Sequence, residues 1–514
     1  MSIDGEFSLY DDFFHTMWGE QKPLAKLFRT DQRGYIYDTG TNKILGCAPL
    51  VYELLQNLFS MDITEAMQFF LKKNGDDEFL YAASSIKTTI ENHSILKLIR
   101  AEEFMVTSDK CSLDEMIQAY RKLLILEATD RCNLRCGYCV YDPINKDNRN
   151  HGKRDMSLEL AMKALRHFRD HSYKEDRVGI TFYGGEPLLV FPFIEHCVEY
   201  LMQLFRDKAL DLSITTNGTL ITPKIAEFLY RNGFQVLVSI DGPEQVHNQY
   251  RKDKSDNGSF KKSLRGLKYL VDAYGDKAED RLRLSMVYTP PYSSKKLDAI
   301  AGLWAEHKWI PQKMDVRMAY PTEGSMPFKY CENYEPEDKS MFEWAFELFR
   351  AKYNKKGISN PIADSIIESA LGNFMRRPIF NIPNKRINMN GCCVPGVSRL
   401  FVTVDGGYLL CERVPSNTPS FGDVHTDVNI DKVKTEFINR FMDISFSDCS
   451  SCWAARLCDS CYMEAFKDGT MCPTSKFKNC DSFKNGKEQY LAYCCTLLED
   501  DPYGLDYLLE KKKN

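Results

Sequence analysis

The sequence has no surplus of basic charge. Its 514 residues contain 67 Lys and Arg against 72 Asp and Glu, a formal net charge of −5 at pH 7. Proteins that bind nucleic acid usually carry a basic patch or stripe, and this balance offers none. We therefore expect neither DNA nor RNA as a partner.

Long apolar runs are missing too. No stretch approaches the roughly 18 apolar residues of a membrane-spanning helix, and Met1 to Tyr10 carry acidic residues where a signal peptide would be basic and then apolar. We expect a soluble, cytoplasmic protein that does not enter a membrane. The length exceeds what one ordinary core supports, so several domains are expected.

Cysteine, by contrast, is abundant. The chain has 18 cysteines, and eleven of them fall between Cys392 and Cys495. Such density indicates disulfides in small secreted chains, but no signal peptide is evident here. In a reducing compartment, clustered thiols indicate metal binding instead.

The first segment, residues 1–115, reads as a small independent unit. Strand-like runs around Tyr35–Asp38 and Lys43–Gly46 precede helical patterns at Pro49–Phe59, Ile63–Lys73 and Phe79–Lys97. The order of strand, strand and three helices predicts a winged-helix-like module.

Residues 120–325 alternate short apolar runs with amphipathic stretches, which predicts an α/β fold. The expected strands are Leu123–Ala128, Val178–Tyr183, Leu212–Thr216, Phe234–Ile240, Leu282–Tyr288 and Met314–Met318. The expected helices are Leu158–Phe168, Phe193–Phe205, Pro223–Tyr230, Lys261–Tyr274 and Leu297–His307. Six such units predict a partial (β/α)6 TIM-like barrel with its active site at the C-terminal ends of the strands.

Three further segments follow the barrel. Residues 326–390 form a connector with a helix around Met341–Tyr353, residues 391–495 are cysteine-rich, and residues 496–514 are a C-terminal tail.

The first expected strand leads into Cys132, Cys136 and Cys139, a C-x3-C-x2-C spacing. Three thiolates on a four-iron cluster leave one iron open for an outside ligand. A structural zinc loop is the alternative, but zinc normally takes four protein ligands and more often uses C-x2-C pairs. The spacing favours iron.

Further motifs stand at the ends of the next three expected strands. These are Thr181–Pro187, which contains Gly184, Gly185 and Glu186, then Thr215–Gly218, and then Ser239–Pro243 followed by Arg251. Each one alone is ordinary turn chemistry. Their succession at strand ends, in order, indicates a common site.

Together these motifs resemble the radical S-adenosylmethionine superfamily, from about Leu123 to Cys480. The resemblance implies that Cys132, Cys136 and Cys139 hold a [4Fe-4S] cluster, which cleaves S-adenosylmethionine to methionine and a 5'-deoxyadenosyl radical. It places Gly184, Gly185 and Glu186 at the methionine ammonium, Ser239 and Asp241 near the ribose, and Arg251 near the methionine carboxylate. The cofactor-binding residues it implies are Tyr138, Gly184, Gly185, Glu186, Thr216, Asn217, Ser239, Asp241 and Arg251.

The cysteine-rich segment resembles the SPASM extension, which holds two auxiliary [4Fe-4S] clusters. Cys449, Cys452, Cys458 and Cys461 form a C-x2-C-x5-C-x2-C run, although the family usually has three residues in the last gap. The resemblance implies Cys449, Cys452, Cys458 and Cys480 on the distal cluster, with Cys472 as the alternative to Cys480. Cys411, Cys461 and either Cys392 or Cys393 would hold the nearer one. Zinc knuckles are the alternative.

The nearer cluster has no obvious fourth cysteine, which suggests an open iron for a substrate thiolate; Cys331, Cys494 and Cys495 are spare candidates. Glu412 stands where related sulfatase-maturing enzymes carry an acidic base, so it is the candidate catalytic residue. The N-terminal module resembles units that capture a leader peptide as an added strand, with a scaffolding or dimerisation domain as the alternative.

The whole resembles the maturases that install sulfur-to-carbon thioether links in cysteine-rich peptides, the sactipeptide and ranthipeptide synthases. The implied partners are a precursor peptide, bound through its leader, and an electron donor such as flavodoxin or ferredoxin. Carbon–carbon crosslinking and oxidation of a sulfatase residue to formylglycine are the alternatives within the superfamily. From another class, a metal-binding regulator that binds peptide without turnover stays open.

Overall fold

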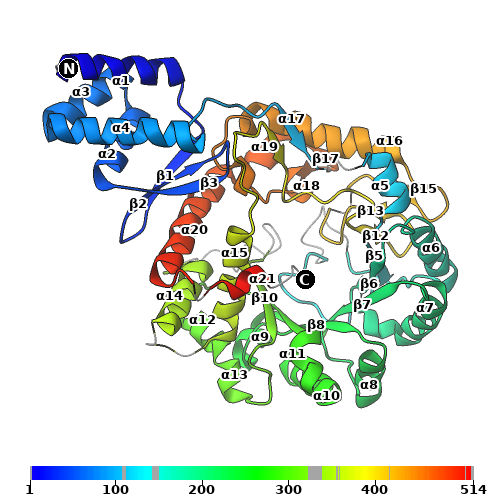
Figure 1. Cartoon of the computed structure of the whole chain (residues 1–514). Coiled ribbons are helices and arrows are strands. Elements are labelled where there is room, and N and C mark those ends of the chain that lie inside the picture. The colour runs from blue at the N-terminus through cyan, green and yellow to red at the C-terminus, as the bar shows by residue number, and fades with distance from the viewer. Residues whose placement is uncertain are drawn as a thin grey trace.

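The computed structural model describes residues 3–106, 111–141, 150–321, 338–354, 357, 359–415, 417–503 and 505–510. A small N-terminal lobe projects from a larger α/β body (Figure 1). No helix among the described residues is both long and apolar enough to cross a membrane.

The N-terminal lobe has its own apolar core, built around side chains such as Phe14, Trp18 and Phe70. Its elements are α1 (Ile3–Trp18), β1 (Ala25–Arg29), β2 (Gly34–Asp38), β3 (Lys43–Cys47), α2 (Pro49–Ser60), α3 (Ile63–Asn74) and α4 (Asp76–His93). The strands form an antiparallel sheet in the order β1-β2-β3. The sequence prediction missed α1 and β1, although α1 buries Tyr10, Phe14 and Trp18 at helical spacing.

The six expected strands of the α/β body are all present and run parallel. They are β5 (Leu123–Thr129), β6 (Arg177–Gly184), β7 (Ala209–Thr216), β8 (Gln235–Ser239), β9 (Leu282–Val287) and β10 (Asp315–Ala319). The helices between them are α6 (Leu158–Asp170), α7 (Phe191–Leu204), α8 (Pro223–Arg231), α10 (Phe260–Tyr274), α12 (Ser294–Ala301) and α13 (Leu303–Glu306). The last two divide the predicted helix Leu297–His307 at Gly302. Neighbouring strands follow chain order, as consecutive elements of a chain usually do.

The sheet has two strands more than predicted. β12 (Leu400–Val402) pairs parallel with β5, and β13 (Tyr408–Leu409) returns antiparallel to β12, so the order is β10-β9-β8-β7-β6-β5-β12-β13. Leu400, Phe401 and Val402 are fully buried, which explains why this run joins the sheet. A hairpin of the cysteine-rich segment thereby extends the barrel sheet and carries Cys411 and Glu412 to its edge.

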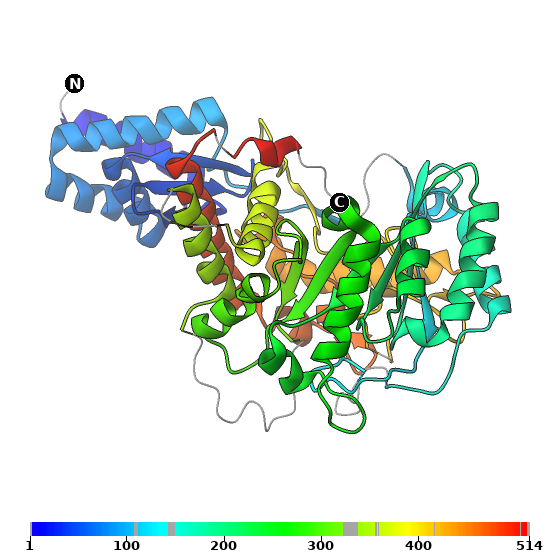
Figure 2. The same cartoon turned by 90° about the horizontal axis from the view of Figure 1, so that it is seen from below.

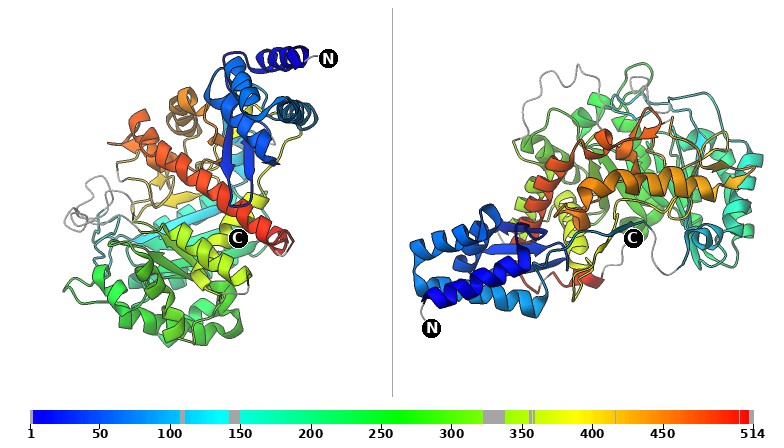
Figure 3. Two further views of the ribbon diagram at one scale, coloured as in Figure 1. Left: turned by 90° about the vertical axis from the view of Figure 1, so that its left-hand side faces the viewer. Right: turned by 90° about the horizontal axis from the view of Figure 1, so that it is seen from above.

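Two helices of the connector and one long C-terminal helix pack together beside the sheet. They are α14 (Met341–Tyr353), α15 (Pro361–Met375) and α20 (Cys480–Asp500), and α20 crosses the expected boundary between residues 495 and 496. Figure 2 and Figure 3 show α20 running from the α/β body to the N-terminal lobe.

The remaining elements are short. They are β4 (Glu103–Met105), α5 (Leu113–Ala119), η1 (Pro187–Val190), α9 (Glu244–Tyr250), η2 (Gly275–Lys277), α11 (Ala278–Arg281), β11 (Arg386–Asn388), β14 (Gly422–Asp423), β15 (Asp427–Val428), α16 (Ile430–Lys432), η4 (Val433–Asn439), α17 (Arg440–Cys449), η5 (Ala455–Leu457), α18 (Tyr462–Ala465), β16 (Phe466–Lys467), β17 (Thr470–Met471), α19 (Pro473–Phe477) and α21 (Tyr507–Glu510).

The lobe is attached through polar contacts with α20. Lys26 pairs with Glu488 at 2.7 Å, and the Tyr35 hydroxyl donates to the buried Glu499 carboxylate at 2.6 Å. These contacts involve β1 and β2. Within the described residues β3 pairs with β2 alone, so no strand of that part of the chain occupies its other edge.

Candidate functional site

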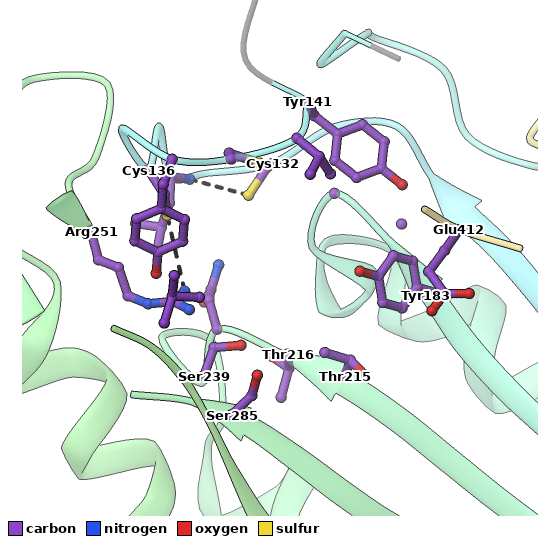
Figure 4. A pocket seen from close by; sticks show the side chains of 18 of the residues that line it. Cys132, Cys136, Tyr141, Tyr183, Thr215, Thr216, Ser239, Arg251, Ser285 and Glu412 are labelled. Carbon is purple, nitrogen blue, oxygen red and sulfur yellow. Dashed lines mark hydrogen bonds between the residues drawn. The ribbon is translucent and has the colours of Figure 1, made fainter. Parts of the chain in front are cut away.

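The three-cysteine loop lies at the C-terminal edge of the barrel sheet, directly after β5. Its backbone is fixed from the side, since Arg135 N donates to Lys252 O at 2.7 Å and Gly137 N to Tyr250 O at 2.9 Å. Cys132, Cys136 and Cys139 all line one cavity of about 380 Å³ (Figure 4). The loop is therefore held open toward a space large enough for a small cofactor.

The donor set of this cavity fits an iron–sulfur cluster. Burial raises the pKa of the Cys132 and Cys136 thiols to about 12, so metal binding would be needed to ionise them near neutral pH. In the described part of the chain, no three His, Cys, Asp or Glu side chains close around a single metal ion. Three thiols lining one cavity are the donor set of a four-iron cluster that leaves one iron open, so the residues present fit that group.

Gly184 and Gly185 press directly against the start of the cysteine loop. Gly184 has φ +140, and a Cβ there would lie 2.2 Å from Thr129 O. A Cβ on Gly185 would lie 2.1 Å from Arg131 O, while Gly185 N donates to Thr129 O at 2.9 Å. Only glycine allows this approach, which leaves backbone lining the cavity between the first two strand ends.

Glu186 is fully buried and fastens the ends of β6 and β7 together. Its carboxylate accepts from the Thr216 hydroxyl and from Asn217 N, both at 2.7 Å. Burial raises the pKa of Glu186 to about 7 although these hydrogen bonds oppose the shift. Thr216 and Asn217 line the cavity, whereas Glu186 lies behind its wall.

A buried ion pair supports the opposite wall. Asp241 accepts from Arg251 Nε at 2.9 Å and from the Tyr138 hydroxyl, and it lies outside the cavity lining. Arg251, Tyr138 and Ser239 do line the cavity, and Arg251 Nη1 is 4.0 Å from Cys136 Sγ. Asp241 thereby positions a positive charge beside the cysteine loop.

Glu412 lies at the far side of the same cavity, so the cysteine-rich segment contributes to the barrel site. Figure 4 places Glu412 and Tyr183 on the side away from Arg251. Arg399 Nη1 lies 3.4 Å from Glu412 Oε1. The sequence prediction missed other lining residues, among them Tyr141, His151, Ser285 and Arg413. Tyr141 and His151 carry no motif, and their rings stack 5.7 Å apart.

A second cavity of about 590 Å³ occupies the inner face of the sheet and shares Tyr183, Thr215, Ser285 and Glu412 with the first. Arg283 and Arg317 also line it. Closed TIM barrels fill this interior with branched apolar side chains. Here polar side chains leave the lumen accessible from the three-cysteine site.

The cysteines of the C-terminal region fall into two spatial sets. In the first set, burial raises the pKa of Cys449 to about 12. This pKa is raised further by three nearby thiols, those of Cys458, Cys452 and Cys480. Cys480 thus lies near Cys449, whereas the Cys472 thiol contacts the Thr474 and Ser475 hydroxyls. The arrangement thus joins Cys480 to the C-x2-C pair.

The second set lies nearer the barrel. Burial raises the pKa of Cys411 to about 11, with Glu412 and Cys461 adding to the shift. Cys461 in turn neighbours Cys393, and Cys392 neighbours both. Cys494 and Cys495 are buried in α20, and Cys331 lies outside the described residues. The individual ligand roles remain predictions.

Residues 126–293 match the family model of the Radical SAM superfamily. The chain therefore carries a radical SAM domain, whose cofactors are a [4Fe-4S] cluster and S-adenosylmethionine, and the resemblance drawn from the cysteine loop is confirmed. The match begins within β5 and includes the three-cysteine loop and the glycine pair.

Two curated relatives mature sulfatases. The serine-type anaerobic sulfatase-maturating enzyme of Bacteroides thetaiotaomicron is 37% identical over 142 residues, which cover 27% of this chain and 34% of that protein. The cysteine-type enzyme of Clostridium perfringens is 28% identical over 353 residues, 65% of this chain and 87% of the relative. The chain matches the first of its relatives over less than half of their lengths.

Solved structures share the fold. The structure described as anSMEcpe with bound AdoMet superposes with a TM-score of 0.55 at 21% identity, covering 76% of this chain and 98% of that one. A second structure of anSMEcpe also holds a Cp18Cys peptide and has a TM-score of 0.50 at 20% identity, covering 72% of this chain and 98% of that one. These likenesses extend beyond the region matched by the family model.

Proposed function

We propose that this protein is a radical S-adenosylmethionine peptide maturase that forms sulfur-to-carbon thioether crosslinks in a cysteine-rich precursor peptide. The observation that carries the proposal is the shared cavity, in which the three-cysteine loop faces Glu412 from the cysteine-rich segment. Radical formation and the handling of a substrate thiol would then occur in one space.

The chain's own residues would hold the cofactors as follows. Cys132, Cys136 and Cys139 would bind three irons of the barrel cluster, and the Arg251 guanidinium would face the methionine carboxylate. Ser239 and Thr216 would lie along the nucleoside. When bound, the barrel cluster supplies the electron that splits S-adenosylmethionine to a 5'-deoxyadenosyl radical, and the auxiliary clusters supply an acceptor for the electron released on sulfur–carbon bond formation.

Each thioether removes two hydrogens from the peptide, one from carbon and one from sulfur. The carbon-bound hydrogen atom would leave with 5'-deoxyadenosine, and the thiol proton would pass to the Glu412 carboxylate. Arg399 Nη1 lies 3.4 Å from Oε1 of that carboxylate and would hold it in place for this role. The lumen of the sheet offers space for the peptide beside Glu412.

The N-terminal lobe would select the precursor. A leader peptide bound as a strand needs an open sheet edge, and β3 has one within the described residues. The lobe contacts α20, which begins at Cys480, so a leader bound there would tether its core peptide to the body that carries the site.

A second candidate is oxidation of a sulfatase cysteine or serine to formylglycine, favoured by the matches to the two sulfatase-maturating enzymes. Both candidates require the same radical chemistry and a base near the substrate side chain. They differ in the product that forms after hydrogen abstraction. The first gives a sulfur–carbon bond and the second gives an aldehyde.

The deciding experiment is mass spectrometry of two peptides after anaerobic incubation with reconstituted enzyme, S-adenosylmethionine and dithionite. One is a cysteine-rich precursor encoded beside this chain, and the other carries a sulfatase modification motif. Loss of two hydrogens per crosslink, with as many thiols withdrawn from alkylation after full reduction, supports the thioether synthase. An aldehyde in the sulfatase peptide alone supports the second candidate, and 5'-deoxyadenosine with both peptides unchanged contradicts both.

A further inference from the structure

Lys476, on α19, carries a buried ammonium in the cysteine-rich region. The residue is 3% exposed, and its Nζ lies 5.3 and 5.5 Å from the ring centroids of Phe441 and Phe477. Nζ also lies 3.2 Å from the Ser460 hydroxyl. Among the described residues no carboxylate forms a salt bridge with Lys476.

The charge of Lys476 acts on thiols of both cysteine sets, on Cys449 in the first and on Cys392 in the second. Its partner Ser460 separates Cys458 of the distal set from Cys461 of the nearer set, and Cys392 Sγ is 3.9 Å from Ser460 O. In the distal set, Cys480 Sγ is 4.0 Å from the main-chain carbonyl oxygen of Lys476. The positive charge also acts on Cys449 and Cys458. Lys476 therefore adjoins both proposed cluster sites.

A buried cation with one neutral hydrogen-bond partner is costly, because it loses hydration without gaining an anion. Neutral thiols do not compensate for that loss. Two iron–sulfur clusters with thiolate ligands are anionic, and they would surround this ammonium with negative charge. The placement of Lys476 thus agrees with clusters on both sides of it.

We propose that Lys476 is a shared positioning residue that raises the reduction potentials of both auxiliary clusters. The inference rests on the ligand sets proposed above. Reduction adds negative charge to a cluster, so a nearby buried cation stabilises the reduced form, and cluster potentials respond to local charge and hydrogen bonding. Higher potentials would make the auxiliary clusters better acceptors for the electron that leaves the substrate.

The test is a redox titration followed by electron paramagnetic resonance on the reconstituted full-length chain. Cys132, Cys136 and Cys139 are all changed to Ala, so that only the auxiliary clusters contribute signals. In that background Lys476→Met, which keeps a similar volume, is expected to shift both auxiliary midpoint potentials downward. Lys476→Arg is expected to restore them toward the starting values.

Lys484→Met is the matched control. Lys484 lies near Cys452 and Cys480 but is 38% exposed and paired with Asp481 at 3.2 Å. Solvent screens its charge, so its removal should shift the distal potential less and leave the nearer one unchanged.

Several results would overturn the inference. Unchanged potentials in a Lys476→Met protein with full iron content would show that the ammonium does not act on the clusters, and a shift in only one of them would end its shared role. If Lys476→Met loses iron, Lys476→Gln replaces it in the same comparison. Absence of auxiliary signals from the starting protein would refute the ligand sets and this inference together, while the peptide assay would still judge the proposed function separately.

Discussion

The two cysteine regions of this protein are built in different ways. The barrel loop stands at the ends of long parallel strands, and its supports, Glu186 and the Asp241–Arg251 pair, are complete within the protein. The C-terminal cysteines lie in loops and at helix ends, such as Cys449 at the end of α17 and Cys480 at the start of α20, near the buried Lys476, which pairs with no carboxylate among the described residues. We therefore expect the fold to organise the barrel site and the tail to depend on the metal that it would hold.

The strongest test of this division removes the cysteines of one region at a time. Changing Cys132, Cys136 and Cys139 to Ala should reduce 5'-deoxyadenosine formation to background, because no iron is left to bind S-adenosylmethionine. Changing Cys449 and Cys452 to Ala should preserve that cleavage and abolish the peptide product. Chromatographic measurement of 5'-deoxyadenosine beside mass spectrometry of the peptide checks both halves.

Glu412 links the two regions, so it offers the next test. Glu412→Gln should slow peptide modification by about 100-fold, a common cost of losing a general base, and leave 5'-deoxyadenosine formation largely intact. Single-turnover assays measure both rates. An equal fall in the two would mean that Glu412 supports the barrel site and has no role in handling the thiol.

The barrel's internal support can be measured without any cofactor. Asp241→Asn leaves Arg251 buried without its partner, which typically costs about 3–5 kcal/mol. Asp405→Asn is the control: it also removes an ion pair with an arginine, but Asp405 is 63% exposed and the expected cost is below about 1 kcal/mol. Urea unfolding of the metal-free proteins measures the free energy of unfolding of each variant. Equal losses of stability in the two variants would contradict the buried network.

A smaller effect concerns pH. Because burial raises the pKa of Glu186 to about 7, the folded state binds its proton more tightly than the unfolded state does. Its contribution to stability is present at low pH and lost as pH rises through about 7. Between pH 5 and 8, the wild type should lose about 2 kcal/mol relative to Glu186→Gln. The measurement is the free energy of unfolding of both proteins across this pH range. If the two values changed with pH in parallel, the raised pKa of Glu186 would be contradicted.

The sequence pattern predicted the parallel sheet well, because strands such as β6, β8 and β9 alternate buried with half-buried residues and β5 is a continuous buried run. The motifs placed Gly184 and Ser239 at strand ends and Arg251 a few residues after one of them, and all three line one cavity. Gly184 approaches Thr129 O because β5 and β6 lie side by side. This contact can be predicted once the two strands are assumed to be parallel neighbours.

Other features lay outside the reach of local patterns. β12 is only three residues long and pairs with β5, far away in the sequence, so no short-range signal marks it as part of the barrel sheet. For the same reason the presence of Glu412 in the barrel cavity could be reached only through family resemblance. The burial of Lys476 beside both cysteine sets is likewise a tertiary property, since lysine in a short helix usually faces solvent.

The most direct test of the division between the regions is iron and sulfide analysis with Mössbauer spectroscopy on reconstituted protein. The wild type should hold three [4Fe-4S] clusters, and the variant with Cys132, Cys136 and Cys139 changed to Ala should lose one third of that iron. Adding S-adenosylmethionine should change the spectrum of the wild type but not that of the variant. A wild type with iron for a single cluster, or with zinc in the tail, would contradict the account.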